Sequence, residues 1–543
     1  MKKIMDGNKA CSLVSYKFTE VAGIYPITPA SGMAESIDQM STNGEKNFFD
    51  SKVKVVEMQS EAGAIAAVHG MLQNGVLSST YTASQGLLLM LPNMYKIAGE
   101  LLPCVINVAA RTIATHALSI MGDHSDIYAV RSTGFAMLAS SSVQDVMNLT
   151  NVAYLSTIKG KIPFINFFDG FRTSHELNKI EVIDFEKVKK LIDQNALKEF
   201  RESSLDLDNP TTRGTNQGDA VYFENMESRN KYYNNLPDIV NDYLEKINEI
   251  TGSNYKPFNY YGNKNANHVI VAMGSVCETI KEYIDYANEK IGLIEVHLYR
   301  PFSSKYFLKA LPSSVNKITV LSRTKEFGSK EPLYLDVLNV LKENDLSLEV
   351  FSGRYGLSSK DTDLSMIKAV YDNTTKPEFT IGIEDDVTNL SLPINNLEVD
   401  HDYGEILIYG YGSDGMVTTS KDILTIIGDN TNKFVQGYFE YDSKKSGGVT
   451  KSHLRFSNKP IKSTYYVEQP KVVVCSKDTY LRKYDMISKI KENGIFILNT
   501  EQDEIALPED YIDIIKQRNI KVYTIDASGI AKENKIFARE LNP

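Results

Sequence analysis

Short apolar runs of strand length alternate along the chain with longer stretches of helical periodicity. The clearest runs cover Val105–Ala110, residues 268–273 and residues 405–409. Such alternation is typical of parallel sheets whose two faces are covered by helices. The pattern therefore predicts an α/β fold, built from consecutive doubly wound domains with mostly parallel sheets.

Two polar stretches interrupt this alternation. Residues 195–266 are rich in Asn, Asp and Tyr and predict an extended connector, and the acidic, Asn-rich residues around 384–402 predict a linker. We therefore expect three domains, at residues 1–262 including the connector, 263–400 and 401–543. The length of 543 residues is sufficient for roughly three or four domains with cores of their own.

Composition and charge exclude several classes of protein. The formal net charge of −10 and the pI of about 5.5 argue against a nucleic-acid partner and an anionic membrane, because either requires a clustered basic surface. The longest apolar runs are shorter than the roughly 20 residues that span a bilayer. The N-terminal residues become polar where a secretory signal has its apolar stretch, so we expect a cytoplasmic protein.

The four cysteines, Cys11, Cys104, Cys277 and Cys475, are scattered singly. Zinc sites and iron–sulfur clusters collect their ligands at short spacing, such as C-x-x-C. We therefore expect no metal or cluster site in this chain. Cys104 and Cys277 lie in or beside apolar stretches and are expected to be buried, reduced thiols.

Polar residues collect where the predicted strands of the first block end. Each of four such strands is followed by one candidate, and the candidates are Thr28, Glu61, Ser84 and Arg111. Ligands of open parallel sheets bind outside the carboxyl ends of the strands, so we expect these four residues to converge on one site. The prolines on either side of Ile27 and Thr28 would fix the direction in which Thr28 points.

Each candidate also has a purely structural interpretation. Ser84 is a suitable N-cap for the helix that follows it. Glu57 and Glu61 lie near a helix start, where carboxylates favour the positive end of the helix dipole without any catalytic role. Arg111 fits a surface or interface position, but residues 112–116 contain no acidic partner, and an unpaired guanidinium beside a cleft suits a ligand carboxylate.

A glycine-rich loop follows the first strand of the third block. Its pattern is G-x-G-x-x-G between a strand and a helix, formed by Gly410, Tyr411, Gly412, Ser413, Asp414 and Gly415. In this context backbone N–H groups and a helix N-terminus face a pyrophosphate. The loop therefore predicts a nucleotide-type phosphate site.

Cations follow the next predicted strand of this block. They are Lys444 and Lys445, with His453 and Arg455 further along the chain. They suit a phosphorylated ligand better than an unphosphorylated ribose. An ordinary glycine-rich turn with a solvated lysine pair is the alternative, and a Rossmann NAD site is the less favoured functional interpretation.

These residues carry a resemblance to one family. Four segments are similar, in order, to successive signatures of pyruvate:ferredoxin (flavodoxin) oxidoreductase: Tyr25-Pro-Ile-Thr-Pro29, Glu57-Met-Gln-Ser-Glu-Ala-Gly63, Thr82-Ala-Ser-Gln-Gly86 and Gly122-Asp-His-Ser-Asp126. The similarity continues through Val271-Ala-Met-Gly-Ser-Val276, His297-Leu-Tyr-Arg-Pro-Phe302, Gly353-Arg-Tyr-Gly-Leu-Ser358 and Tyr441-Asp-Ser-Lys-Lys-Ser-Gly-Gly448. The chain resembles the N-terminal half of that family over nearly its whole length.

The resemblance implies a role for each domain. The first resembles the domain that binds the pyrimidine of thiamine diphosphate, the second a transketolase C-terminal-like domain to which we assign no chemistry, and the third a gamma-type domain assigned to coenzyme A. Glu61 matches the glutamate that hydrogen-bonds the pyrimidine, Arg111 the arginine that receives the substrate carboxylate, and Thr28 a threonine within reach of both ligands. These three are the expected catalytic residues, and Ser84 joins Thr28 and Glu61 in binding the cofactor.

The family also implies parts that this sequence lacks. Its members bind the diphosphate and magnesium through a Gly-Asp-Gly segment, which does not occur here. That segment and the iron–sulfur clusters are expected on a missing C-terminal half, and the third domain is expected to be truncated. Conversion of pyruvate to acetyl-CoA, with electrons passing to ferredoxin or flavodoxin, would then need a partner polypeptide, and the isolated chain would be inactive. By analogy the protein is expected to form a homo-oligomer.

Three hypotheses remain open at this point. The chain is one subunit of a split oxidoreductase, an inactive truncated fragment, or a non-catalytic module that binds coenzyme A.

Overall fold

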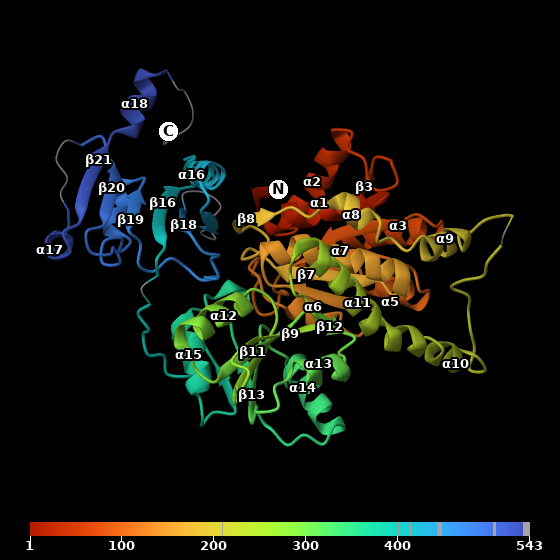
Figure 1. The fold of residues 1–543 in the computed structure, drawn as a ribbon. Coiled ribbons are helices and arrows are strands. Elements are labelled where there is room, and N and C mark those ends of the chain that lie inside the picture. The colour runs from red at the N-terminus through yellow and green to blue at the C-terminus, as the bar shows by residue number, and fades with distance from the viewer. Residues whose placement is uncertain (209, 400, 413, 442–447, 503–506, 536–543) are drawn as a thin grey trace. The chain divides into compact units, whose positions relative to one another are not determined.

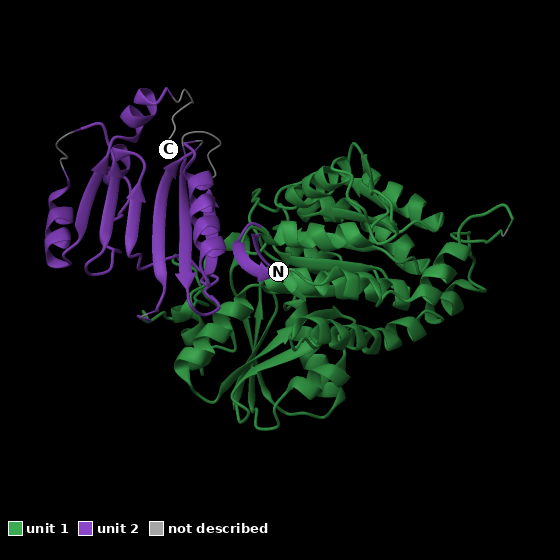
Figure 2. Ribbon diagram, turned by 45° about the horizontal axis from the view of Figure 1, so that its top comes forward, with its two compact units in different colours: residues 1, 6–174, 182–397 green, residues 2–5, 175–181, 398–543 purple. Residues whose placement is uncertain are grey.

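The computed structural model describes residues 1–208, 210–399, 401–412, 414–441, 448–502 and 507–535. The chain divides into two compact units, which Figure 2 distinguishes by colour. Unit 1 comprises residues 1, 6–174 and 182–397, and unit 2 comprises residues 2–5, 175–181 and 398–543. No helix among the described residues has both the length and the hydropathy to cross a bilayer.

The first sheet of unit 1 has seven strands, and all neighbouring strands are parallel except the antiparallel pair at one edge. In spatial order they are β12 (Leu298–Arg300), β6 (Ala136–Ser140), β7 (Phe164–Asp169), β5 (Val105–Ala110), β4 (Ser78–Thr82), β2 (Val21–Ile24) and β3 (Lys54–Glu57). Every residue of β5 is buried, as expected for a central strand covered on both faces. The predicted α/β class is confirmed.

Helices connect these strands and cover the sheet (Figure 1). They are α1 (Gly7–Phe18), α2 (Ser31–Thr42), α3 (Glu61–Gln73), α4 (Ser84–Leu89), α5 (Leu91–Gly99), α6 (Ser125–Ala129) and α7 (Val143–Gly160). A capping box fixes the start of α7, because the side chains of Ser142 and Asp145 each accept the backbone N–H of the other. Ser60 fixes the start of α3 by accepting the N–H of Gly63 at 3.2 Å.

A second sheet, of six strands, also belongs to unit 1. Its order is β15 (Glu378–Thr380), β14 (Glu349–Arg354), β13 (Lys317–Ser322), β10 (His268–Ala272), β11 (Ile291–Val296) and β9 (Phe258–Gly262), with only β9 antiparallel to its neighbour. Its helical elements are α12 (Val276–Ala287), α13 (Ser304–Ala310), α14 (Pro332–Glu343), η1 (Leu357–Ser359) and α15 (Leu364–Asp372). His297 alone separates β11 from β12, so the chain passes directly from one sheet to the other.

Residues 195–266 do not form the extended connector that the polar composition predicted. Three helices occupy much of this stretch, α9 (Gln194–Glu202), α10 (Tyr222–Glu227) and α11 (Asn230–Thr251), and α8 (Phe185–Lys189) precedes them. The 22-residue α11 packs against α7. Its buried apolar side chains recur at helical spacing, at Leu236, Val240, Tyr243, Leu244 and Ile247. The prediction was wrong because the polar face of an amphipathic helix dominated the composition.

Unit 2 contains one sheet of eight strands. Its order is β1 (Lys2–Met5), β8 (Leu177–Glu181), β17 (Phe434–Tyr441), β18 (Val449–Ser457), β16 (Gly404–Tyr411), β19 (Val472–Cys475), β20 (Ile495–Asn499) and β21 (Lys521–Ile525). Pairs from β16 to β21 are parallel, and pairs from β1 to β16 are antiparallel. Its helical elements are α16 (Met416–Asn430), η2 (Asp478–Arg482), α17 (Glu509–Gln517) and α18 (Ala527–Glu533). The antiparallel half, with two strands from the N-terminal region, was not predicted.

Candidate functional site

The four predicted site residues follow four neighbouring strands of the first sheet. Thr28 comes after β2, and the others come after β3, β4 and β5 in turn: Glu61, Ser84 and Arg111. The strands lie in the order β5, β4, β2, β3 and run parallel, so all four junctions lie at the same edge of the sheet. This is the edge where open α/β sheets bind ligands.

Arg111 is held by two backbone oxygens. Its Nη1 donates to the oxygen of Thr28 at 2.8 Å, and its Nε donates to the oxygen of Ser119 at 3.4 Å. No carboxylate among the described residues lies within the 4.0 Å ion-pair distance of this guanidinium, and Nη2 makes no hydrogen bond within the same residues. Burial lowers the pKa of Arg111, and the charge of Asp126 partly opposes that shift. Among the described residues, Nη2 is therefore the nitrogen of this guanidinium that has no acceptor.

Ser84 does not cap a helix. Ala83 occupies the N-cap position of α4 and makes no side-chain cap, while Ser84 is the first helical residue. The hydroxyl of Ser84 donates to the backbone oxygen of Thr112, and its N–H donates to Asp126 Oδ2 at 2.8 Å. Its φ is 53°, in the left-handed region that residues with side chains seldom adopt. Several contacts thus fix Ser84 in an uncommon backbone conformation.

Glu61 begins α3 and is only 6% exposed. Its carboxylate makes no hydrogen bond or ion pair within the described part of the chain. It lies against the start of α4, because a Cβ on Gly86 would stand 2.7 Å from Glu61 Oε1 and 2.6 Å from Thr82 Oγ1. The buried Thr82 hydroxyl also has no hydrogen-bond partner among the residues that the structure describes. A largely buried acid and a hydroxyl without partners suit a ligand that both donates and accepts hydrogen bonds.

Asp126 is a member of this site that the sequence interpretation missed. Its Oδ2 accepts the N–H of Ser84 at 2.8 Å and the N–H of Arg111 at 3.0 Å. Burial raises the pKa of Asp126 to about 7; the two N–H groups counteract the shift, and the Asp123 carboxylate adds to it. Asp126 lies in the Gly122-Asp-His-Ser-Asp126 segment, and that segment was the available signal, although it does not distinguish Asp126 from Asp123.

A segment of the second sheet's region holds the loop after Arg111. Ser119, whose backbone oxygen contacts Arg111, has its hydroxyl 2.6 Å from that of Ser358. Gly122 donates its N–H to the Ser359 hydroxyl at 2.8 Å and accepts the N–H of Ser359 at 2.8 Å. No chemistry was predicted for residues 263–400, and these contacts give the region a supporting role at the site.

The glycine-rich pattern of unit 2 begins in the last two residues of β16, Gly410 and Tyr411, and ends at Gly415 directly before α16. Gly415 precedes α16 with a φ of 86°, and a Cβ on Gly410 would stand 2.9 Å from the Cβ of Met416. The buried Asp414 carboxylate accepts the N–H groups of Tyr411 at 2.6 Å and Met416 at 2.9 Å. These two N–H groups are therefore not available to a phosphate. The predicted ligand residues Ser413, Lys444 and Lys445 lie outside the described residues.

His453 and Arg455 are buried in β18. Arg455 Nε lies 2.9 Å from Glu405 Oε1, and its Nη1 and Nη2 donate to further protein oxygens. His453 Nδ1 accepts the N–H of Val467 at 3.0 Å. The suggestion that Arg455 faces a phosphorylated ligand was wrong, because its guanidinium is used within the fold.

A cavity of about 370 Å³ lies in unit 2 at the carboxyl ends of β16, β19 and β20. Lys477 lies on its wall, with Nζ 3.4 Å from the centroid of the Tyr411 ring. The same wall carries the acidic residues Asp414, Asp478 and Glu501. The position is typical of a ligand site in an open α/β sheet, but the charge of the described wall does not favour a polyphosphate by itself.

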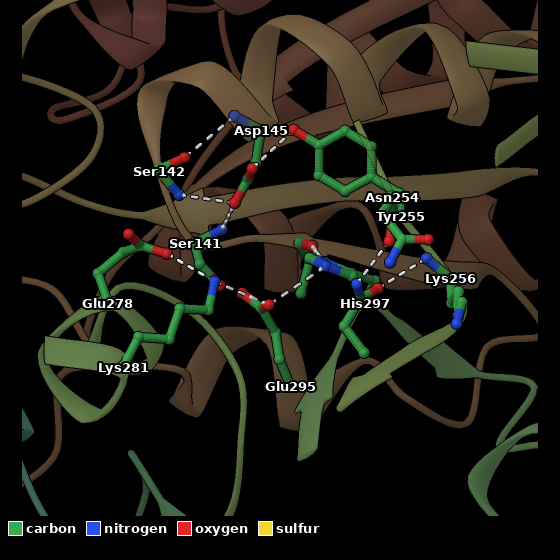
Figure 3. A network of polar contacts seen from close by, with 12 residues as sticks. Ser141, Ser142, Asp145, Asn254, Tyr255, Lys256, Glu278, Lys281, Glu295 and His297 are labelled. Carbon is green, nitrogen blue, oxygen red and sulfur yellow. Dashed lines mark hydrogen bonds and ion pairs between the residues drawn. The ribbon is translucent and has the colours of Figure 1, made fainter. Parts of the chain in front are cut away.

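An acidic group in unit 1 has the spacing of a metal site. One carboxylate oxygen from each of Asp145, Glu278 and Glu295 lies within 4.8 Å of the other two. Figure 3 shows the Lys281 side chain between two of them, with Nζ 2.7 Å from Glu278 Oε1 and 3.0 Å from Glu295 Oε2. Burial opposes the charge on Lys281, but the carboxylates raise its pKa well above the usual value. An ammonium group thus supplies the positive charge, and we assign the cluster a structural role.

All four cysteines are buried and free. This agrees with the prediction for Cys104 and Cys277.

The fold is shared with a solved 2-oxoacid oxidoreductase. The 2-oxoglutarate:ferredoxin oxidoreductase from Magnetococcus marinus, solved with 2-oxoglutarate, coenzyme A and succinyl-CoA bound, superposes with a TM-score of 0.51 at 18% identity, over 68% of this chain and 65% of its own. At that identity the likeness concerns the fold alone. The fold class is that of the 2-oxoacid:ferredoxin oxidoreductases.

Three family models match consecutive parts of the sequence. The thiamine diphosphate-binding domain of pyruvate flavodoxin/ferredoxin oxidoreductase matches residues 14–245, core domain II of pyruvate:ferredoxin oxidoreductase matches residues 266–365, and the pyruvate ferredoxin/flavodoxin oxidoreductase model matches residues 405–541. The chain belongs to the pyruvate:ferredoxin/flavodoxin oxidoreductase family and corresponds to the N-terminal portion of its members.

Curated relatives agree with this assignment. The pyruvate-flavodoxin oxidoreductase of Enterobacter agglomerans is 51% identical over 546 residues, which cover 98% of this chain and 46% of the relative. The pyruvate:ferredoxin oxidoreductase of Moorella thermoacetica is 51% identical over 552 residues, which cover 99% of this chain and 47% of the relative. The chain spans about half the length of these relatives.

Proposed function

We propose that this chain supplies the pyrimidine side and the substrate side of a thiamine diphosphate-dependent pyruvate:ferredoxin/flavodoxin oxidoreductase. The observation that carries the proposal is the convergence of Thr28, Glu61, Ser84 and Arg111 at one edge of the first sheet. Two of these side chains offer groups without protein partners among the described residues, the carboxylate of Glu61 and Nη2 of Arg111. The first receives the cofactor's pyrimidine, and the second receives the carboxylate of pyruvate.

The residues have separate roles in this proposal. Arg111 binds and orients the 2-oxo acid through a charge-assisted hydrogen bond, while Thr28 and Ser119 hold its guanidinium in place. Glu61 would hydrogen-bond the pyrimidine ring and hold a proton there, and its low exposure limits competition from water. Thr28 and Ser84 position the ligands. Thiamine diphosphate supplies the carbanion chemistry when it is bound.

Coenzyme A is the proposed second ligand, bound by unit 2. The cavity at the ends of β16, β19 and β20 supports this proposal by its position, and the glycine-rich loop of Gly410, Gly412 and Gly415 adjoins it through Asp414. Asp414 accepts two N–H groups of the loop, so these groups cannot bind the phosphates of coenzyme A. The phosphates therefore need side-chain cations from another part of unit 2. Lys444 and Lys445 are the proposed source, with Ser413 as a further contact.

The remaining parts of the reaction are proposed for another polypeptide. The relatives contain about as much sequence again as this chain covers, and the proposed partner carries the diphosphate site with its magnesium ion, the iron–sulfur clusters and the surface for ferredoxin or flavodoxin. Within the chain, residues 1–262, 263–400 and 401–543 are the proposed thiamine, supporting and coenzyme A parts. The assembly is proposed to be a homo-oligomer of such pairs.

Reconstitution tests this proposal. The chain is mixed with the separately produced C-terminal portion of the Enterobacter agglomerans relative, and the product is called the reconstituted complex below. Pyruvate-dependent viologen reduction that requires both polypeptides, thiamine diphosphate and coenzyme A supports the proposal. An inactive mixture in which the chain still binds coenzyme A favours the non-catalytic module. An inactive mixture without coenzyme A binding favours an inactive fragment.

A further inference from the structure

We propose that Asp126 is a positioning residue. It fixes the proposed cofactor side and the proposed substrate side of the site relative to each other, by holding the backbone at both Ser84 and Arg111. The inference deepens the proposed function, on which it depends only for the identity of the ligands. Asp126 touches neither proposed ligand and acts through the residues that do.

The geometry joins two separate strand ends through one atom. Asp126 Oδ2 accepts the N–H of Ser84, after β4, at 2.8 Å and the N–H of Arg111, after β5, at 3.0 Å. Its other oxygen, Oδ1, accepts the N–H of Ile127 at 2.8 Å and so ties the carboxylate to α6. The side chain is fully buried, so water does not compete for these contacts.

The contact on the Ser84 side determines where Glu61 lies. Ser84 has a left-handed φ of 53°, an uncommon conformation that surrounding contacts must maintain. It is the first residue of α4, and Gly86, two residues later, provides the surface against which the Glu61 carboxylate packs. A change in the direction of the chain at Ser84 therefore moves the acid proposed to bind the pyrimidine.

The contact on the Arg111 side determines where the guanidinium lies. The backbone of Arg111 is fixed by Asp126, and the end of its side chain by the oxygens of Thr28 and Ser119. Because the backbone and the guanidinium of Arg111 are both held, Nη2 points in one fixed direction. Because Ser84 and Arg111 share one acceptor atom, the proposed cofactor and substrate sides cannot shift independently.

The ionised carboxylate suits this position because it only accepts hydrogen bonds, and three backbone N–H groups point at it. An amide in its place has one accepting oxygen and an NH₂ group. With the oxygen toward Ser84 and Arg111 the NH₂ group faces the N–H of Ile127, and in the opposite orientation it faces both bridging N–H groups. Asp123, in the same sequence segment, offers a matched comparison. It is also buried, but within the described residues Asp123 Oδ1 accepts only from Ser125, at 2.9 Å from the backbone nitrogen and 2.6 Å from the hydroxyl. Asp123 therefore has no contact with the Ser84 side, and it reaches the chain after β5 only through the Ser125 hydroxyl, which accepts the N–H of Ile113 at 3.0 Å.

Hydrogen exchange of the purified chain tests the positioning directly. Asp126→Asn is compared with Asp123→Asn and the wild-type chain. We expect amides in residues 84–90 and 111–122 to exchange about tenfold faster in Asp126→Asn, with β5 and β7 unchanged, whereas Asp123→Asn leaves residues 84–90 at the wild-type rate. Unchanged exchange in both segments would overturn the inference. Asp126→Ser, which keeps one acceptor, serves for the same comparison where the amide variant does not fold.

Kinetics in the reconstituted complex distinguish positioning from general destabilisation. A mispositioned Arg111 raises KM for pyruvate, and we expect a rise of about tenfold or more in Asp126→Asn and no change in Asp123→Asn. A fall in kcat at unchanged KM, as produced by a smaller folded fraction, would contradict the positioning role. A wild-type complex without activity counts against the proposed function, and the exchange comparison then decides the role of Asp126 by itself.

Discussion

Nη1 of Arg111 lies 2.8 Å from the backbone oxygen of Thr28, so the arginine after β5 is oriented by the loop after β2. The strand β4 lies between these two strands in the sheet. The contact thus joins residues that are distant in sequence and gives the guanidinium a fixed direction without pairing it with a carboxylate. A guanidinium with a fixed direction loses little conformational freedom when it binds an anionic ligand.

The first prediction concerns this guanidinium. In the reconstituted complex, Arg111→Ala is expected to raise KM for pyruvate by about tenfold to 100-fold, because a hydrogen bond to a charged group is lost. The affinity for thiamine diphosphate should change much less. Arg201→Ala is the control, since Arg201 forms an exposed ion pair with Glu20. Equal affinity for pyruvate in Arg111→Ala would remove Arg111 from the site.

The second prediction concerns Gly86. A Cβ at this position would lie 2.7 Å from Glu61 Oε1, so Gly86→Ala is expected to displace the carboxylate and lower thiamine diphosphate affinity in the reconstituted complex by about tenfold. Gly70→Ala, in α3, is the matched control because a Cβ there meets no atom within 4 Å. It should leave affinity unchanged and stabilise the chain by about 0.5–1 kcal/mol. Calorimetric titration that finds both variants equal to wild type would disprove this placement of Glu61.

The third prediction concerns the pH dependence of stability at Asp126. Its pKa is raised from 3.8 to about 7 in the folded chain, so the folded state binds the proton more tightly than the unfolded state. The stability this provides, on the order of 4 kcal/mol, is fully present below pH 3.8 and is lost as the pH rises through about 7. The charged groups that act on Asp126 are Asp123 and Arg111.

Thermal unfolding followed by circular dichroism checks the third prediction. Between pH 4 and pH 7 the midpoint of Asp126→Asn should fall less steeply than that of the wild-type chain. Parallel profiles would show that Asp126 does not titrate in this range.

The fourth prediction concerns the cluster around Lys281. Lys281→Met leaves the carboxylates of Glu278 and Glu295 without their ammonium partner, and the expected loss is about 3–5 kcal/mol in unfolding free energy at pH 7. Lys246→Met removes an exposed pair with Asp242 and should cost less than about 1 kcal/mol. Urea unfolding measures both. If both variants lost the same small amount of unfolding free energy, the ammonium group of Lys281 would not be what stabilises the carboxylates of the cluster.

Sequence periodicity was sufficient to predict the class of fold and the edge of the first sheet at which the candidate residues meet. Apolar runs of strand length locate β2, β3, β4 and β5 in the sequence, and the residues after parallel strands necessarily meet at the same edge. Thr28, Glu61, Ser84 and Arg111 could therefore be chosen from sequence alone. Their roles came from the resemblance to a family and not from the spacing.

Other features depend on contacts that periodicity does not contain. Asp126 matters because its carboxylate reaches two strand ends at once, and nothing local distinguishes it from Asp123. The glycine pattern predicted a phosphate loop, yet Asp414, inside that pattern, uses two of its N–H groups. In α11 the polar face masked a buried stripe, and the pairing of β1 with β8 joins segments about 175 residues apart.

The central claim is that this chain provides only the pyrimidine and substrate side of the site. The most direct test is pyruvate-dependent viologen reduction by the purified chain, with thiamine diphosphate, magnesium and coenzyme A, in the absence and presence of the C-terminal portion of the Enterobacter agglomerans relative. We predict no reduction by the chain alone and clear reduction by the reconstituted complex. Reduction by the chain alone would contradict the claim.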